Sequence, residues 1–362
     1  MLDFMQKDRT FLAEIDSQIQ AFTAQISELE DAISHLREAQ QLALDRLNSY
    51  KYPVLSLPDE MVCEIFIRFL PPYPDPSPLV GLLSPTTLTH VCRRWREIAL
   101  ATPDLWKAID LIPPDCLSQI SSTRSIDPIP LNSRHQTRAR ALGSLWIKRS
   151  GSHPLSIRAV DLDNPSFPIF STLLPHRGRL EHLTLHLRSG LPLLKFTTDP
   201  LPRLRSLNLW FQNGLTRPVV LTDVPLLRVV VLGDVRVPSI ALPWAQLTSL
   251  TLRSVYPDHI MRILRQSANL IECTLLFWAA EEPARGDREP NVLLPRLQTL
   301  VVELESEVVV EFFQHLVAPS LRHLEAPDAF FLWGGGSSSS ESLHIFITKS
   351  GCKLHKLYIT EL

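Results

Sequence analysis

Two histidines, His182 and His186, have the residue type and spacing that first suggest chemistry, because imidazole nitrogens bind metals and carry protons near neutral pH. Their separation places both side chains on one face of a β-strand. Two ligands without a third rarely hold a metal, so we interpret them as solvated strand residues. Cys352 has no neighbouring base in a local motif, which argues against a ligase that forms a thioester on this residue.

Motifs of other catalytic classes are absent. The sequence contains no G-x-x-x-x-G-K-[ST], no H-E-x-x-H and no G-x-S-x-G. Its five cysteines are widely scattered without a C-x-x-C pair, which gives neither a zinc site nor the paired cysteines of a RING domain: Cys63, Cys92, Cys116, Cys273 and Cys352. We therefore predict a protein that is not an enzyme and has no metal or cofactor.

Composition and charge predict a folded binding protein. Hydrophobic residues make up 45% of the 362 residues and charged residues 20%, which is typical of about two globular domains. The 36 Lys and Arg balance 38 Asp and Glu, so no net field attracts nucleic acid or an anionic membrane. The sequence also lacks a signal peptide and a membrane span. We expect a soluble protein of a reducing compartment, the cytoplasm or nucleus.

Residues 1–51 are predicted to form one long helix, since neither Gly nor Pro occurs before Pro53. Core positions of a heptad seam follow one another in alternating steps of three and four: Leu12, Ile15, Ile19, Phe22, Ile26, Leu29, Ile33, Leu36, Gln40, Ala43, Leu47 and Tyr50. Such a narrow stripe needs a partner helix. The partner is either another chain in a coiled coil or this protein itself, and the polar Gln40 is of the kind that sets register or oligomeric state.

Residues 52–110 carry three helix start signals. Pro58 is followed by Asp59 and Glu60, which favour a helix N-terminus, and the next signals are Ser84-Pro85 and Thr102-Pro103. The first helix has apolar residues at spacings of three and four, and Pro71 and Pro72 end it: Met61, Val62, Ile65, Phe66 and Phe69. The segment therefore predicts a small helical module.

The segments LSLPDEMVCEIFIRFLP and LTHVCRRWREIALATPDLWKAIDL resemble the F-box. F-box modules are small helical bundles that dock on the Skp-type adaptor of SCF ubiquitin ligases. By position, the resemblance implies five adaptor-binding residues: Leu57, Pro58, Met61, Ile65 and Phe66. It places Trp95 and Trp106 in the core of the module.

One part of the module departs from the F-box pattern. The interval from Leu70 to Val91 is longer than usual and carries extra prolines, which affects the middle of the module. The alternative interpretation of residues 52–110 is a helical hairpin that only packs on the rest of the chain.

The remaining residues, 137–362, contain internal repeats. The pattern L-x-x-L-x-L, or an apolar variant, begins at Leu180, Leu204, Leu227, Leu247, Leu270, Leu297, Leu321 and Leu354. The intervals of 20 to 33 residues lie close to the 20 to 29 of leucine-rich repeats. In such repeats each short strand buries alternate leucines against its neighbours, which predicts a curved solenoid. Helices are expected at 137–151, 258–268 and 308–317, and GGGSSSS at 334–340 is expected to be a surface insertion.

The expected fold is α/β: a long N-terminal helix (1–51), a helical F-box module (52–110), a linker (111–136) and a leucine-rich-repeat-like solenoid (137–362). The last region resembles the degenerate leucine-rich repeats that follow an F-box in fungal proteins. Together with the preceding coiled coil, the order of parts resembles large mushroom F-box families.

A target-binding surface is expected on the face of the sheet opposite the leucines, because side chains alternate along a strand. Its predicted residues are His186, Asn208, Trp210, Arg253, Glu303, Glu325 and Tyr358. Trp210 is a residue type enriched in binding hot spots, and Arg253 suits an acidic or phosphorylated target. The alternative is that Trp210 folds under a loop as part of the core.

The leading hypothesis is a substrate-recognition subunit of an SCF-type ligase that binds a Skp-type adaptor, through it a cullin, and a target protein. It involves no nucleic acid or membrane, and the N-terminal helix allows self-association. The alternative hypothesis is a coiled-coil scaffold in which the F-box-like module serves only structure. An exposed apolar face between Leu57 and Phe66 would favour docking, and burial of that face would favour the scaffold.

Overall fold

The computed structural model describes residues 2–49, 56–112, 133–161, 169–187, 193, 199–211, 218–233, 240–255, 257–277, 291–303, 308–327 and 341–360. The predicted surface insertion at 334–340 and Cys116 lie outside these residues, as does most of the predicted linker. The chain divides into two compact units, Met1–Met61 and Val62–Leu362.

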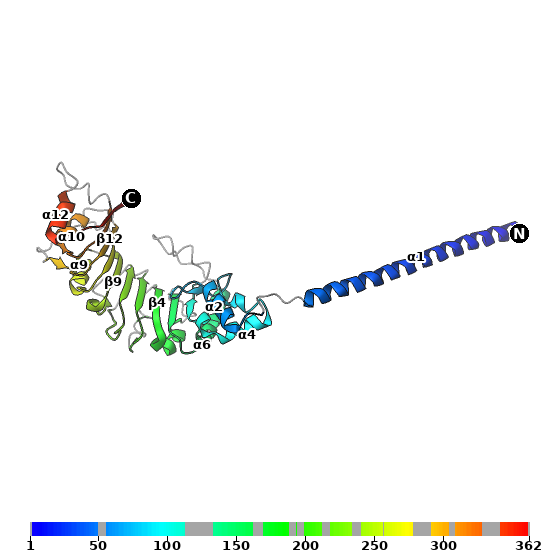
Figure 1. Ribbon diagram of the computed structural model, residues 1–362, viewed down its shortest axis with the longest axis horizontal. Helices are drawn as coiled ribbons and strands as arrows, with labels where there is room; N and C mark the ends of the chain where they lie inside the picture. Colours follow the sequence, from blue (N-terminus) through cyan, green and yellow to red (C-terminus); the bar gives the residue numbers. More distant parts are fainter. Residues whose placement is uncertain are drawn as a thin grey trace. The chain divides into compact units, whose positions relative to one another are not determined.

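Helix α1, Leu2–Ser49, fills most of the first unit as one uninterrupted helix (Figure 1). The absence of Gly and Pro allows every turn to keep its backbone hydrogen bonds. Along the predicted seam, eight large apolar side chains are 47% to 70% exposed: Leu12, Ile19, Phe22, Ile26, Leu29, Ile33, Leu36 and Leu47.

Short helices make up the predicted 52–110 module: α2 Asp59–Phe69, α3 Pro85–Leu88, α4 Arg93–Ala101 and the 3-10 helix η2 Pro103–Trp106. Side chains cap two of them. Ser84 accepts a hydrogen bond from the Thr86 amide at the start of α3, and the Cys92 sulfur accepts one from the Trp95 amide at the start of α4. Helices begin at the three predicted starts, but the segment after Ser84, which we expected to be one helix through Ile98, forms two, because α3 ends at Leu88 and Cys92 caps a separate α4.

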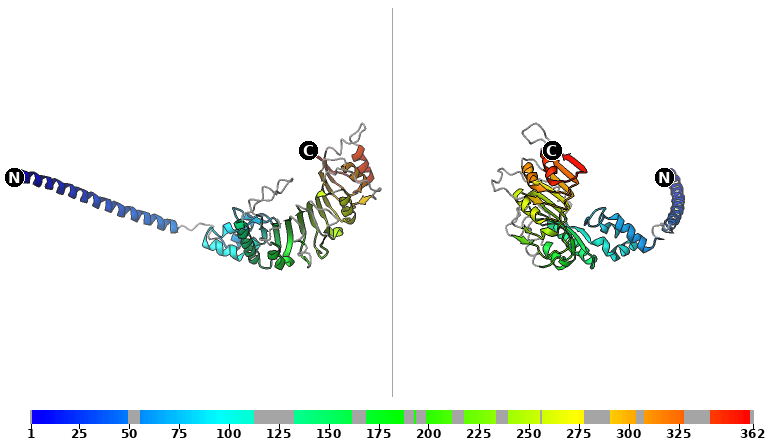
Figure 2. Two further views of the ribbon diagram at one scale, coloured as in Figure 1. Left: turned by 180° about the vertical axis from the view of Figure 1, so that it is seen from behind. Right: turned by 60° about the vertical axis from the view of Figure 1, so that its left-hand side comes forward.

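An eleven-stranded parallel sheet dominates the second unit, and its strands lie side by side in chain order (Figures 1 and 2). The strands are β1 Ser77–Pro78, β2 Ala108–Asp110, β3 Leu155–Asp161, β4 Leu180–Leu187, β5 Ser206–Phe211, β7 Val229–Gly233, β9 Ser249–Val255, β10 Glu272–Phe277, β12 Thr299–Glu303, β14 His323–Pro327 and β15 Lys356–Thr360. The sheet begins inside the predicted 52–110 module, because β1 and β2 belong to that module.

The connecting segments contain further short elements. Two small parallel pairs join β6 Val219–Val220 to β8 Ile240–Ala241 and β11 Val292–Leu293 to β13 Leu316–Val317. The helices are α6 Ser133–Arg149, α7 Ile169–Leu173, η3 Leu174–Arg179, η5 Trp244–Gln246, α9 Pro257–Gln266, α10 Val308–His315 and α12 Glu341–Ser350. Helices α6, α9 and α10 overlap the three predicted helical segments.

The same turn precedes most strands. The amide of Leu204 donates to the Leu201 carbonyl, and that of Leu227 donates to the Val224 carbonyl. Equivalent bonds close the turns at Leu247, Leu270, Leu297 and Leu321. Each of these leucines is fully buried two residues before its strand pairs. The leucine periodicity of the sequence therefore predicts both the strand positions and their register.

Side chains alternate between two faces along each strand. The buried face carries the core, for example Leu207, Leu209 and Phe211 in β5. The alternate residues of β5, Ser206, Asn208 and Trp210, are only partly buried. We name the side of the sheet that carries these partly buried residues the open face.

We predict that adjacent residues of β9 respond differently to truncation. Leu252→Ala should lower the free energy of unfolding by about 2–5 kcal/mol, because Leu252 is fully buried. Thr251→Ala, on the open face, should change it by about 0.5 kcal/mol or less. Denaturant unfolding of both variants measures the difference, and equal losses would contradict the alternation.

Candidate functional site

Helix α2 has an exposed apolar side. Met61, Ile65 and Phe69 follow one another at intervals of four residues, which places them along one side of the helix. Met61 is 53% exposed and Ile65 is 43% exposed. Of the other predicted adaptor-binding residues, Pro58 is exposed and Leu57 is partly buried. Large apolar side chains left in water along a helix are typical of a binding surface.

Phe66 does not belong to this exposed side. Its ring is fully buried and contacts Trp95 edge-on, with 4.9 Å between the ring centroids. Val62, one turn earlier, is also buried. The prediction that Phe66 contacts an adaptor is therefore wrong, because this side of α2 packs into the core of the module.

Two tryptophans organise that core. Trp106 is fully buried, and its indole nitrogen donates to the Ala99 carbonyl at 2.9 Å. It also contacts Trp146 of α6 edge-on at 5.4 Å and lies under the guanidinium of Arg149. Helix α6 thus packs directly on the helical module, and Trp106 is the core residue that its position implied. Trp95 is partly buried against Phe66.

The proline-rich interval after α2 joins the sheet. Strand β1 pairs with β2, and the Ser156 hydroxyl of β3 donates to the Pro74 carbonyl. Tyr73 donates a hydrogen bond of 2.8 Å to Glu181 and contacts His182 edge-on. Burial and this bond to Glu181 raise the pKa of Tyr73 above its usual range. The extra residues of the interval therefore bind the first strands of the sheet.

All seven predicted target residues lie in two adjacent rows that cross the strands. One row contains His186, Trp210, Gly233, Arg253, Leu276 and Glu303. The other contains Asp110, Arg158, Thr184, Asn208, Val231, Thr251, Thr274, Val301, Glu325 and Tyr358. The structure places them on one face but spreads them from β4 to β15, where Tyr358 is 54% exposed.

His186, Trp210 and Arg253 form a contiguous group at one end of this face. The rings of His186 and Trp210 are nearly parallel, at 6° and with 5.8 Å between centroids. The Arg253 guanidinium lies 5.7 Å from the Trp210 ring. A Cβ atom at position 233 would lie 2.3 Å from Cε3 of Trp210, so Gly233 is required for the indole to cross β7.

These contacts answer two questions left by the sequence. His186 is only 8% exposed, so the prediction that it stands in solvent is wrong, although its face is the predicted one. Trp210 is partly buried on the open face. The Trp210 ring lies over Gly233 and part of its surface is still accessible to solvent. Trp210 is therefore neither a side chain that protrudes from the surface nor part of the core, the two alternatives that the sequence allowed.

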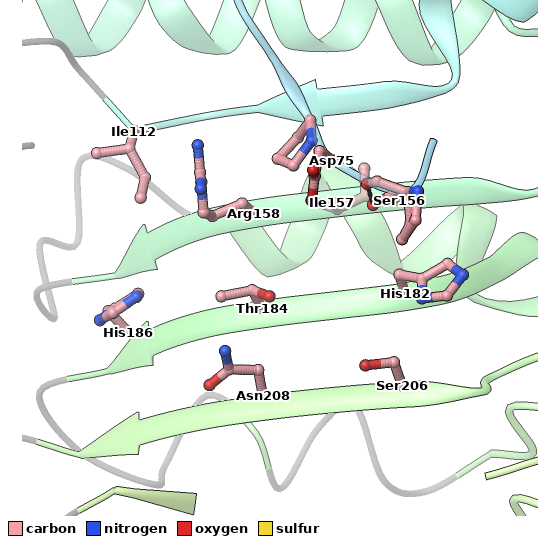
Figure 3. Close-up of a pocket in the computed structure, with 12 residues that line it drawn as sticks. Asp75, Ile112, Ser156, Ile157, Arg158, His182, Thr184, His186, Ser206 and Asn208 are labelled. Atoms are coloured by element: carbon pink, nitrogen blue, oxygen red, sulfur yellow. Dashed lines mark hydrogen bonds between the residues drawn. The ribbon is translucent and has the colours of Figure 1, made fainter. Parts of the chain in front are cut away.

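A pocket of about 460 Å³ lies on the open face between β3, β4, β5 and residues 74–76 (Figure 3). Its lining residues are Pro74, Asp75, Pro76, Ile112, Ser156, Ile157, Arg158, His182, Thr184, His186, Ser206 and Asn208. Arg158, Thr184 and Asn208 are consecutive members of one row, so they line up across the three strands (Figure 3).

The positive charge of Arg158 at the pocket is paired with Asp110. Asp110, only 2% exposed, accepts hydrogen bonds from the Ile112 amide at 3.0 Å and from Arg158 Nε at 3.1 Å. Burial lowers the pKa of His186 to about 4, and the positive charge of Arg158 acts in the same direction. Burial also lowers the pKa of His182 below its usual value. Both imidazoles are therefore neutral at physiological pH.

The structure adds little in favour of catalysis. Among the described residues, no group of three or more His, Cys, Asp or Glu is placed to hold a metal ion. Burial raises the pKa of the Cys352 thiol and raises that of Cys273 to about 12, which disfavours the nucleophilic thiolates. Within the same residues, no helix combines the length and apolar character that a membrane crossing requires.

Comparison with protein families decides the nature of the helical module. Residues 54–112 match the family described as F-box-like. The chain contains an F-box-like domain. Comparisons with curated proteins and with solved structures found no match. The family match covers the helices α2 to η2 and the first two strands of the sheet, so the F-box-like domain and the sheet share backbone pairing.

Several contributors to these surfaces were missed in the sequence. Asp110 and Arg158 have no local spacing that connects them, since they meet only through the pairing of β2 with β3. Tyr73 is likewise far in sequence from its partner Glu181. Gly233 did carry a usable signal. A glycine inside a predicted strand marks a close approach by a neighbour, and here the neighbour is Trp210 of the preceding strand.

We predict that Gly233→Val displaces the Trp210 indole from β7, because the added side chain occupies its position. The free energy of unfolding should fall by about 1–3 kcal/mol. The indole NMR resonance of Trp210, assigned with Trp210→Phe, should shift. Val231→Thr, on the same strand and face, serves as the control. An unmoved indole resonance in Gly233→Val would show that Trp210 does not lie over this residue.

Proposed function

We propose that this chain is a substrate-recognition subunit of an SCF-type ubiquitin ligase, which binds a Skp-type adaptor through its F-box-like domain and a target protein through the open face. The observation that carries the first part is the exposed apolar side of α2 within the family match. A cullin ligase would then be reached through the adaptor. An intracellular location, in the cytoplasm or nucleus, follows from that assembly.

The second part of the proposal treats residues 137–362 as a leucine-rich-repeat-like solenoid. It is supported by the repeated turn, the buried leucine before each strand and the parallel order of the strands. Each strand covers the apolar side chains of the one before it, so the array buries a core only through stacking. The open face is then a continuous surface on which a target can be held.

The F-box-like domain generally serves as an adaptor module without catalytic activity, and we extend that role to the whole chain. For the adaptor-binding role to hold, the exposed side of α2 must bind the adaptor directly. The alternative function, a scaffold in which the module serves only structure, would require this apolar side to be covered. The exposure of Met61 and Ile65 favours docking.

We predict that Ile65→Asp weakens binding of a purified Skp-type adaptor by at least about a hundredfold, since an unpaired carboxylate at an apolar interface costs several kcal/mol. Ile67→Asp is the matched control. It changes the same residue type on the same helix, but about 200° around the helix axis, and Ile67 is similarly exposed. Calorimetry with both variants measures the effect. Unchanged affinity in a folded Ile65→Asp protein would contradict the docking assignment.

We also propose that α1 associates with α1 of a second copy as a two-stranded coiled coil. Its exposed seam alternates β-branched and other apolar residues: Ile19, Ile26 and Ile33 at one core position and Phe22, Leu29 and Leu36 at the other. Isoleucine at the first core position with leucine at the second favours two parallel strands. Gln40 then falls at the first position, where a polar pair fixes the register.

We predict that the full chain sediments as a dimer and that Ile26→Asp makes it a monomer, because two buried carboxylates would face each other across the seam. Ser27→Asp, which places the same charge beside the seam and away from the contact, should leave the dimer intact. Sedimentation velocity separates the outcomes. A monomeric wild-type chain would favour packing of the seam within the protein.

A further inference from the structure

The two edges of the parallel sheet are built differently. At one edge, β1 has two residues, one of them Pro78, and Pro74 and Pro76 precede it. Proline has no amide hydrogen to give to a further strand, so this edge is closed. At the other edge, which leads to the C-terminus in Figure 2, β15 has five residues and no proline. Its one neighbour among the described strands is β14. Backbone groups of β15 are therefore free on its outer side.

The free backbone groups belong to alternate residues of β15. The amide of Lys356 donates to the Arg322 carbonyl, directly before β14, at 3.1 Å. Successive residues of a strand direct their N–H and C=O groups to opposite sides in the plane of the sheet. Leu357 and Ile359 therefore direct theirs to the free edge. An extended peptide that lies along this edge exchanges backbone hydrogen bonds with both residues.

The core side of β15 is also uncovered. Leu357 is 40% exposed and Ile359 is 54% exposed, although their register partners on β14, Leu324 and Ala326, are fully buried. In a stacked array the core residues of one strand stay in water until the next strand covers them. A partner strand with apolar residues at the two matching positions buries both side chains. The edge thus selects an extended segment in which apolar residues alternate.

The start of this edge is basic. Lys353, His355 and Lys356 are exposed, and Arg322 lies beside them, because its carbonyl accepts hydrogen bonds from the amides of His355 and Lys356. Lys353 and Lys356 have no ion pair within the described part of the chain. Of the residues of β14 and β15, Glu325 is the one acid, and it lies two residues beyond the start of β14. Acidic residues of a partner complement this end of the edge.

We propose that an acidic, extended segment of the target protein adds to the free edge of β15 as the next strand of the sheet. The proposal rests on the target-binding role proposed above, and it names the chemistry of the bound segment: apolar residues at alternate positions, with acids at the end beside Lys353 and Lys356. Lysine at a sheet edge often prevents pairing. Here Lys356 only begins the strand, and the residues that follow it are uncharged.

The experiment measures binding of fluorescein-labelled peptides to the full chain by anisotropy, with and without the adaptor. One peptide has three aspartates followed by alternating valine and threonine, and a second has the same residues in reverse order, because the acids reach Lys356 from either strand direction. In two further peptides lysine replaces the aspartates. We expect one of the acidic peptides to bind at least about tenfold more tightly than both lysine peptides, and increasing salt to reduce this difference.

Methylation of the peptide backbone tests strand pairing without any change in the protein. One version of the tighter-binding peptide carries N-methyl groups on the valines and another carries them on the threonines. Residues of one set direct their N–H groups at β15, and those of the other set direct them away. One version should therefore lose binding, and the other should stay within about threefold of the unmodified peptide. Equal affinities of the two versions would contradict strand addition.

Two matched pairs of variants locate the binding. Lys356→Glu should weaken it about fivefold or more, whereas Lys148→Glu reverses the charge of an exposed lysine on α6 and should have no effect. Ile359→Ser should weaken binding to a similar extent, because it removes an apolar contact of the core side. Ile67→Ser, at a similarly exposed isoleucine of α2, is its control. Melting temperatures show that each variant is folded.

Three further outcomes would overturn the inference: no binding of any peptide at millimolar concentration, equal binding of the acidic and lysine peptides, or equal effects within both pairs of variants. A dimer of Ile26→Asp that Ile359→Ser converts to a monomer would also overturn it, by assigning the edge to a second copy. Adaptor affinity is measured on the same preparations. Adaptor binding without peptide binding rejects the edge and leaves the adaptor role standing, whereas peptide binding without adaptor binding rejects the ligase role.

Discussion

Backbone pairing of β2 with β1 on one side and β3 on the other is the interaction on which the rest of the structure depends. Parallel strands exchange hydrogen bonds only in register, so three residues, Ala108–Asp110, set the position of the F-box-like helices relative to the whole sheet. Ile109 points into the core and is fully buried, while Asp110 faces the other way. Just before this strand, Trp106 fixes the helices through its hydrogen bond to Ala99.

The outward direction of Asp110 places a carboxylate where solvent hardly reaches it. Such a group is stable only with partners, and Asp110 has the Ile112 amide and Arg158. The ion pair holds the guanidinium in a fixed place and cancels most of its charge. Burial, and to a smaller extent the charge of Arg158, lowers the pKa of His186 and keeps its imidazole neutral. A short strand in the F-box-like domain thus sets the polarity of a surface on the sheet.

Much of this arrangement could be predicted from the leucines. Their spacing indicated where eight of the eleven strands of the main sheet begin, from β4 onward, and period-two alternation then assigned seven residues to the open face. The sequence of α2 could not show which of its two sides is exposed, because Ile65 and Phe66 are both apolar and only packing decides which one is buried. For His186 the predicted face was correct. The ring of Trp210 stacks on His186 and covers it. Gly233 in the neighbouring strand leaves the space that the Trp210 ring occupies.

The pocket could not be predicted, because its walls come from five separate parts of the sequence. The one signal was the extra proline content between Leu70 and Val91, which stood out only as a departure from the F-box pattern. In the structure these prolines surround β1, an edge strand of the sheet. Proline lacks the amide hydrogen that a further strand would require, so it suits this position. Residues 74–76, directly before this edge strand, close one side of the pocket, and the hydrogen bond from the Ser156 hydroxyl to the Pro74 carbonyl ties them to β3.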